Sequence, residues 1–275
     1  MLDKKTKKKI KDFVISLKLY FLSFFNSNLG FYFKVAGTSK NSDAYEAISS
    51  IIKRKKIKNI LEIGIGGHAN DYEGGLSILA LKQFFPNSKI IGVDIAEKKF
   101  LDSKRIKTIK LDQSNSEELK EMAKLYGKFD LIIDDGSHFC DHQRKTFLTL
   151  FEYLNDDGFY IIEDINNSYK VAGGGSPELD YEKNNVTFFK DLIHVVNSNF
   201  LHKEIQKKYN EFVNIDKFLF FPGIIILQKK IKKTEPKTKE YLHLTLDEFN
   251  KYWTEKKNMN ISKSKSGILY KEKKF

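Results

Sequence analysis

Residues 57–67 read Ile-Lys-Asn-Ile-Leu-Glu-Ile-Gly-Ile-Gly-Gly, an apolar, β-branched run that ends at glycines. A run of this length fits a buried strand, and the glycines allow positive φ angles and a close approach of the backbone to a ligand. Further runs of the same kind occupy residues 89–95, 106–111, 129–133 and 159–162. The sequence therefore predicts five buried strands that follow one another along the chain.

Helical patterns separate these strands. They cover residues 44–52, 76–85, 117–126 and 142–154, and Asp156-Asp157-Gly158 lies between the last of them and the next strand. Apolar strands that alternate with helices predict βαβ units and a parallel sheet covered on both faces. Residues 218–221 and 224–227 flank Pro222-Gly223 and predict a closing antiparallel pair. We therefore expect an α/β fold with a Rossmann-like, doubly wound, mostly parallel sheet.

The positive charge is concentrated at the two ends of the chain. The 275 residues have a net charge of +12 and are 41% apolar, which suits one large domain with appendages. Residues 1–18 hold seven lysines against two aspartates, and residues 229–275 hold fourteen lysines against six acidic residues. We expect a basic, aromatic helical arm over residues 1–35, a domain over 36–230, and a lysine-rich extension over 231–275 that includes a short helix at 244–253.

Two scarce residue types exclude classes of function. Arg54, Arg105 and Arg144 are the only arginines, whereas nucleic-acid readers usually depend on arginine for bidentate contacts. We therefore expect no specific nucleic-acid partner and interpret the lysines as solvated tails. Cys140 is the only cysteine, which excludes an internal disulfide and a cysteine zinc site and fits a reducing cytoplasm.

The arm allows two interpretations. Lys4 to Lys11 form a basic run, and the apolar stretch over residues 13–25 is interrupted by Lys18 and is too short to span a bilayer. An amphipathic helix that docks on the domain or on a partner subunit is the first interpretation. Peripheral membrane contact through residues 1–25, at the inner face, is the second. We also expect a cytoplasmic homo-oligomer.

Polar residues follow the predicted parallel strands at their carboxyl ends. They are Glu62, Gly64, Gly66 and His68, then Asp94, then Asp112 and Gln113, then Asp134, Asp135 and His138, and finally Glu163 and Asp164. In an open parallel sheet the carboxyl ends of the strands share one edge, where ligands bind. Seven carboxylates on one edge indicate a functional site.

The glycine turn favours S-adenosylmethionine over a dinucleotide. Gly64, Gly66 and Ala69 match the dinucleotide fingerprint only weakly. Glu62 precedes the first glycine by two residues, where an acid can meet the cationic amino group of a methionine. The following Asp71-Tyr72-Glu73 does not suit a pyrophosphate. Asp94 can bind both hydroxyls of an adenosine ribose, and capping of a helix is its other interpretation.

The fourth and fifth strand ends predict a metal ion. Asp134, Asp135, Glu163 and Asp164 would repel one another if all were ionised, so either protons are retained or a cation is bound. Oxygen ligands without cysteine indicate a hard ion, Mg²⁺ first, with Ca²⁺ or Mn²⁺ as alternatives. Helix capping by these acids is the other interpretation. The imidazole of His138, in the same loop, can act as a general base.

The same residues carry a family resemblance. Leu-Glu-Ile-Gly-Ile-Gly-Gly at 61–67, Asp-Tyr-Glu-Gly-Gly-Leu at 71–76, Asp-Gln-Ser at 112–114, Asp-Asp-Gly-Ser-His at 134–138 and Ile-Glu-Asp at 162–164 resemble the class I, metal-dependent sugar O-methyltransferases of the macrocin and mycinamicin type. The resemblance runs from about residue 36 to about residue 223. It implies that residues 36–230 form an S-adenosylmethionine-binding domain.

The resemblance also implies roles for individual residues. It implies Mg²⁺ held by Asp135, Glu163 and Asp164, with His138 as the base, so that Asp135 and His138 form the catalytic pair. It implies cofactor contacts from Glu62, Gly64, Gly66, Asp94, Asp112, Gln113 and Asp134. His68 departs from the family pattern, because many class I methyltransferases have a further glycine at this position.

The acceptor and two competing classes remain open. We expect methyl transfer to a hydroxyl of a nucleotide-linked or surface-polysaccharide sugar, and rank glycosylated natural products second. An NAD(P)-dependent sugar oxidoreductase or epimerase would need a Tyr-x-x-x-Lys pair, and neither Tyr126 with Lys128 nor Tyr209 with Lys217 has that spacing. A non-catalytic nucleotide-binding module is the other alternative, and the presence of four carboxylates and His138 argues against it.

Overall fold

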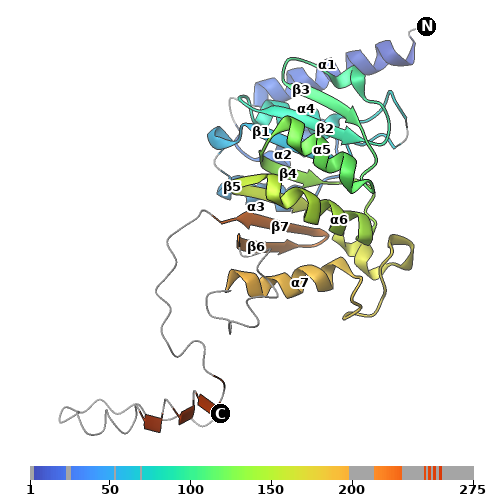
Figure 1. The fold of residues 1–275 in the computed structure, drawn as a ribbon. Helices are drawn as coiled ribbons and strands as arrows, with labels where there is room; N and C mark the ends of the chain where they lie inside the picture. Colours follow the sequence, from blue (N-terminus) through green and yellow to red (C-terminus); the bar gives the residue numbers. More distant parts are fainter. Residues whose placement is uncertain are drawn as a thin grey trace, which may run out of the picture.

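The protein is built around a seven-stranded sheet in the order β3-β2-β1-β4-β5-β7-β6 (Figure 1). The structure, a computed structural model, describes residues 3–22, 26–52, 54–68, 70–197 and 214–230, and near the C-terminus 245, 247–248, 250–251 and 254–255. The strands are β1 Asn59–Ile63, β2 Lys89–Asp94, β3 Ile106–Lys110, β4 Phe129–Asp134, β5 Leu154–Ile162, β6 Ile215–Phe221 and β7 Ile224–Lys229. β1 to β5 pair in parallel, whereas β7 is antiparallel to both β5 and β6.

Two groups of helices cover the two faces of this sheet. They are α1 Lys4–Leu22, α2 Leu29–Ala36, α3 Ser42–Ile51 and α4 Leu76–Phe84 on one face, and α5 Ser116–Tyr126, α6 Cys140–Leu150 and α7 Asn185–Val196 on the other (Figure 1). Neighbouring residues of a strand point to opposite faces. Accordingly Ile60 packs with the core under α1–α4, and Leu61 packs with the core under α5–α7. The predicted doubly wound sheet with a closing antiparallel pair is confirmed.

The strand order places the site. β1 lies between β2 and β4, so the chain winds outward in opposite directions from the β1–β4 boundary. The connections there leave the sheet on opposite faces and open a crevice at the carboxyl ends of the strands. The glycine turn after β1 and the acidic loop after β4 border this crevice, as the sequence predicts.

β5 differs from the prediction. It begins at Leu154 and includes Asp156-Asp157-Gly158, which we expected before the strand. The register with β4 shifts, because Phe129 pairs with Leu154 and Leu131 pairs with Phe159. Asp157 takes a φ of 66°, so the three residues form an irregularity inside the strand. α6 correspondingly ends at Leu150, four residues before the predicted end.

α1 uses one side of its surface to pack on the domain. Ile15 and Leu19 are buried against the core under α1–α4. A second apolar stripe on the helix is exposed and consists of Ile10, Phe13, Val14, Leu17, Tyr20 and Phe21. The docked side agrees with the first interpretation of the arm, and membrane contact and oligomerisation through the exposed stripe stay predictions. Across the described residues, no helix is both long and apolar enough to cross a bilayer.

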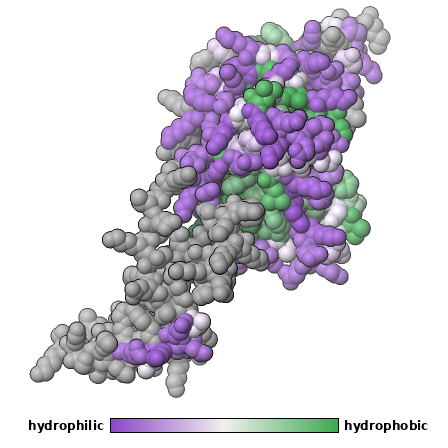
Figure 2. All heavy atoms as spheres, in the orientation of Figure 1, coloured by the Kyte–Doolittle hydropathy of each residue, from purple (hydrophilic) through white to green (hydrophobic). Residues whose placement is uncertain are grey.

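The face drawn in Figure 2 is mostly polar. On the face in Figure 2 the hydrophilic side chains dominate, and apolar ones gather in separate small patches. The proposed boundaries at residues 35 and 230 stay predictions. Ala69 of the glycine fingerprint and most of the predicted helix at 244–253 lie outside the described residues.

Candidate functional site

The glycine turn and the acidic loop are in direct contact. Gly64 has a φ of 76°, and a Cβ atom there would lie 2.0 Å from the backbone oxygen of Asp135, so only glycine fits. The Asp135 amide donates to the Ile63 carbonyl at 2.8 Å, and the Gly64 amide donates to the Val93 carbonyl at 2.8 Å. These contacts connect the carboxyl ends of β1, β2 and β4 on one side of the crevice.

A cavity of about 550 Å³ lies along this wall. Its lining includes eight of the predicted site residues, Gly64, Gly66, Asp94, Asp112, Gln113, Asp135, His138 and Asp164, together with His68. Glu62, Asp134 and Glu163 are buried at or beneath the same edge of the sheet. The residues at the strand ends therefore lie at one edge of the sheet, as predicted, but not all of them line the cavity.

Asp94 anchors the two loops beside it. Its Oδ2 accepts from the Ile65 amide at 3.1 Å, and its Oδ1 accepts from the Ala96 amide at 2.9 Å. Neither bond caps a helix, because Ile65 follows β1 and Ala96 precedes the short helix Lys99–Leu101, and Asp94 also borders the cavity. The two bonds fix the carboxylate at the cavity edge, and its contact with a ribose stays a prediction.

Gln113 connects the end of β3 to the end of β4. Its Nε2 donates to Asp134 Oδ1 at 2.6 Å, and its Oε1 accepts from the Ser137 amide at 2.8 Å. Asp134 Oδ2 is buried without a hydrogen-bond partner. Burial raises the pKa of Asp134 to about 7, against the lowering effect of Gln113. Asp112 lies at the cavity edge, and its Oδ1 accepts from the Ser114 amide at 2.8 Å.

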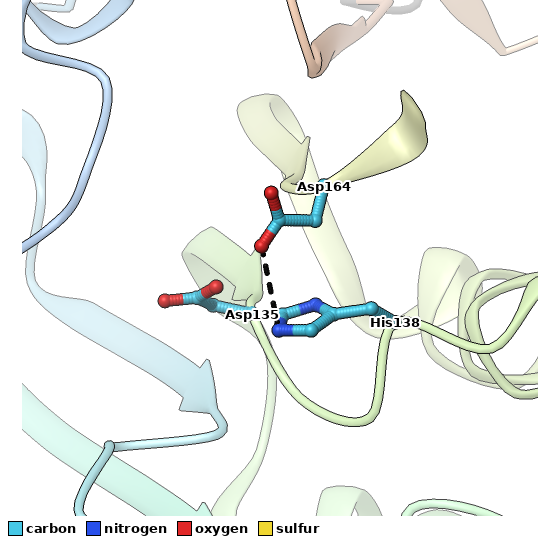
Figure 3. A group of neighbouring side chains, drawn as sticks. All are labelled: Asp135, His138 and Asp164. Carbon is cyan, nitrogen blue, oxygen red and sulfur yellow. Dashed lines mark ion pairs between the residues drawn. The ribbon is translucent and has the colours of Figure 1, made fainter. Parts of the chain in front are cut away.

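Three side chains form a group that can hold a metal ion. Asp135, His138 and Asp164 each offer one ligand atom, and these atoms lie within 4.8 Å of one another (Figure 3). His138 Nε2 lies 3.4 Å from Asp164 Oδ2. His138 and Asp164 have φ angles of 59° and 52°, a conformation that costs free energy in residues other than glycine and often marks functional sites.

Lys40 is a functional residue that the sequence reasoning missed. It lies between α2 and α3 and is almost fully buried, and its Nζ is 2.5 Å from Glu163 Oε1, 2.8 Å from Asp135 Oδ2 and 3.1 Å from Glu62 Oε1. We expected retained protons or a bound ion to relieve the repulsion among the acids, and the chain itself supplies a cation. Burial alone would lower the pKa of Lys40, but its acidic neighbours raise it well above the usual value.

Glu163 and Glu62 belong with Lys40 more than with the metal-binding group. Glu163 Oε1 also accepts from the Tyr45 hydroxyl at 2.6 Å, and Glu62 Oε2 accepts from Ser77 Oγ at 3.0 Å. Burial raises the pKa of Glu62 to about 7, and it raises that of Glu163 as well, although Lys40 opposes both shifts. Lys40 and Tyr45 bind the Glu163 carboxylate on the α2–α3 side, and its role as a metal ligand beside Asp135 and Asp164 stays a prediction.

The remaining singled-out residues lie around the site. His142 Nδ1 is 2.9 Å from the Ser137 hydroxyl on the loop before α6. His68 borders the cavity, and its backbone oxygen accepts from Lys98 Nζ at 3.2 Å. Lys98 also donates to the carbonyls of Asn70 and Glu73, so it organises the glycine-rich turn. Cys140 is buried and forms no disulfide.

The residues present fit both implied groups. Two carboxylates and an imidazole converge on one point, and His138 Nδ1 and Asp134 Oδ2 are buried polar atoms without a partner. The two carboxylates suit a hard divalent ion, and the imidazole lies beside them where it could accept a proton. The cavity beside it is lined by Gly64, Gly66, Asp94 and Asp112, which suits an adenosine with its ribose hydroxyls on an acid.

A family model and several known proteins match the chain. The family model is described as a methyltransferase domain and matches residues 54–241. Mycinamicin VI 2''-O-methyltransferase of Micromonospora griseorubida is 42% identical over 125 residues, which are 46% of this chain and 31% of the relative. Demethylmacrocin O-methyltransferase of Streptomyces fradiae is 40% identical over 125 residues, or 46% of this chain and 32% of the relative.

A solved structure is similar over more of the chain. It is the MycE methyltransferase from the mycinamycin biosynthetic pathway in complex with Mg, SAH and mycinamycin VI, with a TM-score of 0.67 and 29% identity. The match covers 78% of this chain and 58% of MycE. The chain thus spans about a third of the curated relatives that it matches and under two thirds of the solved one.

Proposed function

Since the chain belongs to the methyltransferase-domain family, we propose that it is an S-adenosylmethionine-dependent O-methyltransferase that acts on a sugar hydroxyl with the help of Mg²⁺. The observation that carries the proposal is the juxtaposition of the Asp135–His138–Asp164 group with a cavity walled by Gly64 and Asp94. The relatives and MycE support it, because the names of the relatives state O-methylation and MycE is described in complex with Mg and SAH.

The donor pocket is assigned to the 550 Å³ cavity. S-adenosylmethionine, when bound, supplies a methyl group on a positively charged sulfur. Asp94 would hold the ribose, and Gly64 and Gly66 would let the backbone approach the cofactor. Asp112 and Gln113 border the side that the adenine would take. Glu62 and Asp134 are buried at the same edge of the sheet. In their ionised forms they would place negative charge near the cationic end of the cofactor.

The metal is assigned to Asp135 and Asp164, with Glu163 next to them. A divalent ion, when bound, supplies a Lewis acid that lowers the pKa of a sugar hydroxyl. Glu163 shares the Lys40 ammonium with Asp135, so we retain it as the third proposed ligand. Lys40 holds these two carboxylates in place while it neutralises part of their charge.

His138 is assigned the proton transfer. Its Nε2 faces Asp164, and a proton that it accepts from the sugar hydroxyl forms an imidazolium 3.4 Å from that carboxylate. In the same step the hydroxyl oxygen forms a bond to the methyl carbon, and the carbon–sulfur bond breaks. The chain contributes most by holding oxygen and methyl at reaction distance.

The acceptor is assigned to a nucleotide-linked or surface-polysaccharide sugar, with a glycosylated natural product as the alternative. The basic arm supports the first class, since anionic sugar acceptors would be attracted to it. The names of the relatives support the second.

Calorimetric titration tests the proposal. We expect S-adenosylmethionine to bind and NADH not to bind, and methyl transfer to a panel of nucleotide-linked, lipid-linked and macrolide sugars to require a divalent ion. Binding of NADH in place of S-adenosylmethionine would favour the oxidoreductase class. Methyl transfer that survives chelation of divalent ions would refute the metal assignment.

A further inference from the structure

A second and larger cavity adjoins the donor cavity. Its volume is about 950 Å³, and it shares Ser39, Gly64, Gly66, Gly67 and Asp135 with the smaller one. Asp135 therefore belongs to both cavities. A sugar whose hydroxyl lies at Asp135 can extend its remaining part into the larger space.

The far wall of this cavity is formed by lysines of α1. Lys4, Lys7, Lys8 and Lys11 line it, and their spacing of three, four and seven residues places them on one side of the helix. Lys8 pairs with Asp12 and lies over the Phe100 ring. Among the described residues, no carboxylate pairs with Lys4, Lys7 or Lys11. Glu73 is the acid that lines the cavity besides Asp135.

The rest of the lining combines glycines and short polar residues with a few apolar or aromatic side chains. The apolar side chains in the wall are Ile65 and Leu76, with the ring of Tyr72 beside them. A bulky uncharged aglycone is bound mainly by apolar and aromatic walls. Three unpaired ammonium groups suit a multivalent anion instead, because lysine binds phosphate as a point charge.

We propose that this lysine-lined cavity binds the diphosphate of a sugar diphosphate acceptor while the sugar lies at Asp135. The proposal rests on the proposed function and specifies its substrate class. A nucleoside-diphosphate sugar and a polyprenyl-diphosphate sugar share this chemistry. The sequence alone suggests that these lysines belong to a solvated tail. Their place in the cavity lining assigns them to the acceptor site instead.

The test uses the full chain saturated with S-adenosylhomocysteine, so that nucleotides cannot occupy the donor cavity. Inorganic pyrophosphate is titrated into the wild type and into the variant Lys4→Gln/Lys7→Gln/Lys11→Gln without divalent ions. We expect the dissociation constant to rise by about tenfold or more in the variant and the binding to weaken with salt. UDP-glucose and phosphatidylcholine vesicles that carry a polyprenyl diphosphate then distinguish the soluble source from the lipid source.

Two further variants control for charge and folding. Lys9→Gln/Lys18→Gln/Lys104→Gln removes three exposed lysines outside the cavity lining, and we expect it to bind pyrophosphate like the wild type. Lys4→Arg/Lys7→Arg/Lys11→Arg retains the charge, and we expect binding to be retained within about threefold. Equal losses in the glutamine variants at lining and control positions, or no binding of diphosphate by the wild type, overturn the inference.

A parallel titration with S-adenosylmethionine separates this inference from the proposed function. If S-adenosylmethionine binds and no diphosphate binds, the acceptor inference is wrong and the methyltransferase proposal stands. If diphosphate binds through the lysines and S-adenosylmethionine does not, the methyltransferase proposal is wrong. Tight binding of mycinamicin VI that the lysine variant does not change, without diphosphate binding, would likewise overturn the inference.

Discussion

Lys40 Nζ and Asp135 Oδ2 lie 2.8 Å apart, although 95 positions separate the two residues in the chain. This contact brings a buried ammonium group to the carboxylate that borders both cavities. The same ammonium reaches Glu62 and Glu163, so one lysine connects the proposed donor and metal residues. The electrostatic balance of the site depends on it.

Replacement of Lys40 by methionine tests that balance. Loss of the ammonium leaves Glu62, Asp135 and Glu163 without their cation, and we expect the free energy of unfolding to fall by about 3–5 kcal/mol in EDTA. Added Mg²⁺ should restore part of this loss. Denaturant unfolding measures both effects, and Lys18→Met, at an exposed position, is the control. An unchanged unfolding free energy for Lys40→Met would contradict the role.

His138 and Asp164 should differ in their effects on binding and rate. We expect His138→Gln to lower kcat by about 10²–10⁴-fold while Mg²⁺ affinity changes little, because the proton acceptor is lost. Asp164→Asn should weaken Mg²⁺ binding and lower kcat, since it removes a proposed ligand. Neither should change the affinity for S-adenosylmethionine by more than about threefold. Titration calorimetry and turnover assays separate the two roles, and identical profiles for the two variants would contradict the division.

Glu62 should make stability depend on pH. Its pKa rises from 4.5 to about 7 on folding, so the protonated form favours the folded state. That contribution is complete below pH 4.5 and is lost as the pH rises through about 7. Glu62→Gln is uncharged at every pH and therefore keeps this contribution to stability. At about pH 8 the variant should be more stable than the wild type by about 3 kcal/mol, and at about pH 4 the two proteins should have equal free energies of unfolding. Parallel stability–pH curves for the two proteins would show that the prediction is wrong.

Gly64→Ala should lower the free energy of unfolding far more than Gly37→Ala does. Both residues have positive φ angles, 76° and 79°, so the conformational cost is matched. The added Cβ at Gly64 would lie 2.0 Å from the Asp135 carbonyl oxygen, whereas no atom lies within 4 Å at Gly37. We expect a loss of about 1 kcal/mol at Gly37 and of about 4 kcal/mol or more at Gly64, measured by denaturant unfolding. Equal losses would exclude steric contact as the cause.

The sequence predicts the sheet and its edge well because both follow from local patterns. Apolar runs such as residues 57–63 mark buried strands, and parallel pairing then requires Asp94, Asp135 and Asp164 to share one edge. β5 begins earlier than the sequence predicts, because Asp156-Asp157-Gly158 has the composition of a turn but lies inside the strand, between the β4-paired residues Leu154 and Phe159.

Lys40 could not be predicted in this way. It lies in a segment rich in glycine, serine and asparagine that has no periodicity, and its partners Asp135 and Glu163 come 95 and 123 positions later. Glu163 and Asp164 are adjacent in sequence, yet one contacts Lys40 and the other faces His138. That separation depends on the tertiary arrangement of α2, α3 and the loop before α6.

The backbone contact between Gly64 and Asp135 has a dynamic consequence. Because the Asp135 amide bonds to Ile63 and leaves no room beside Gly64, neither loop can open without disturbing the other. Amide protons of both segments should therefore exchange with deuterium at similar rates, and a ligand that slows exchange in one loop should slow it in the other.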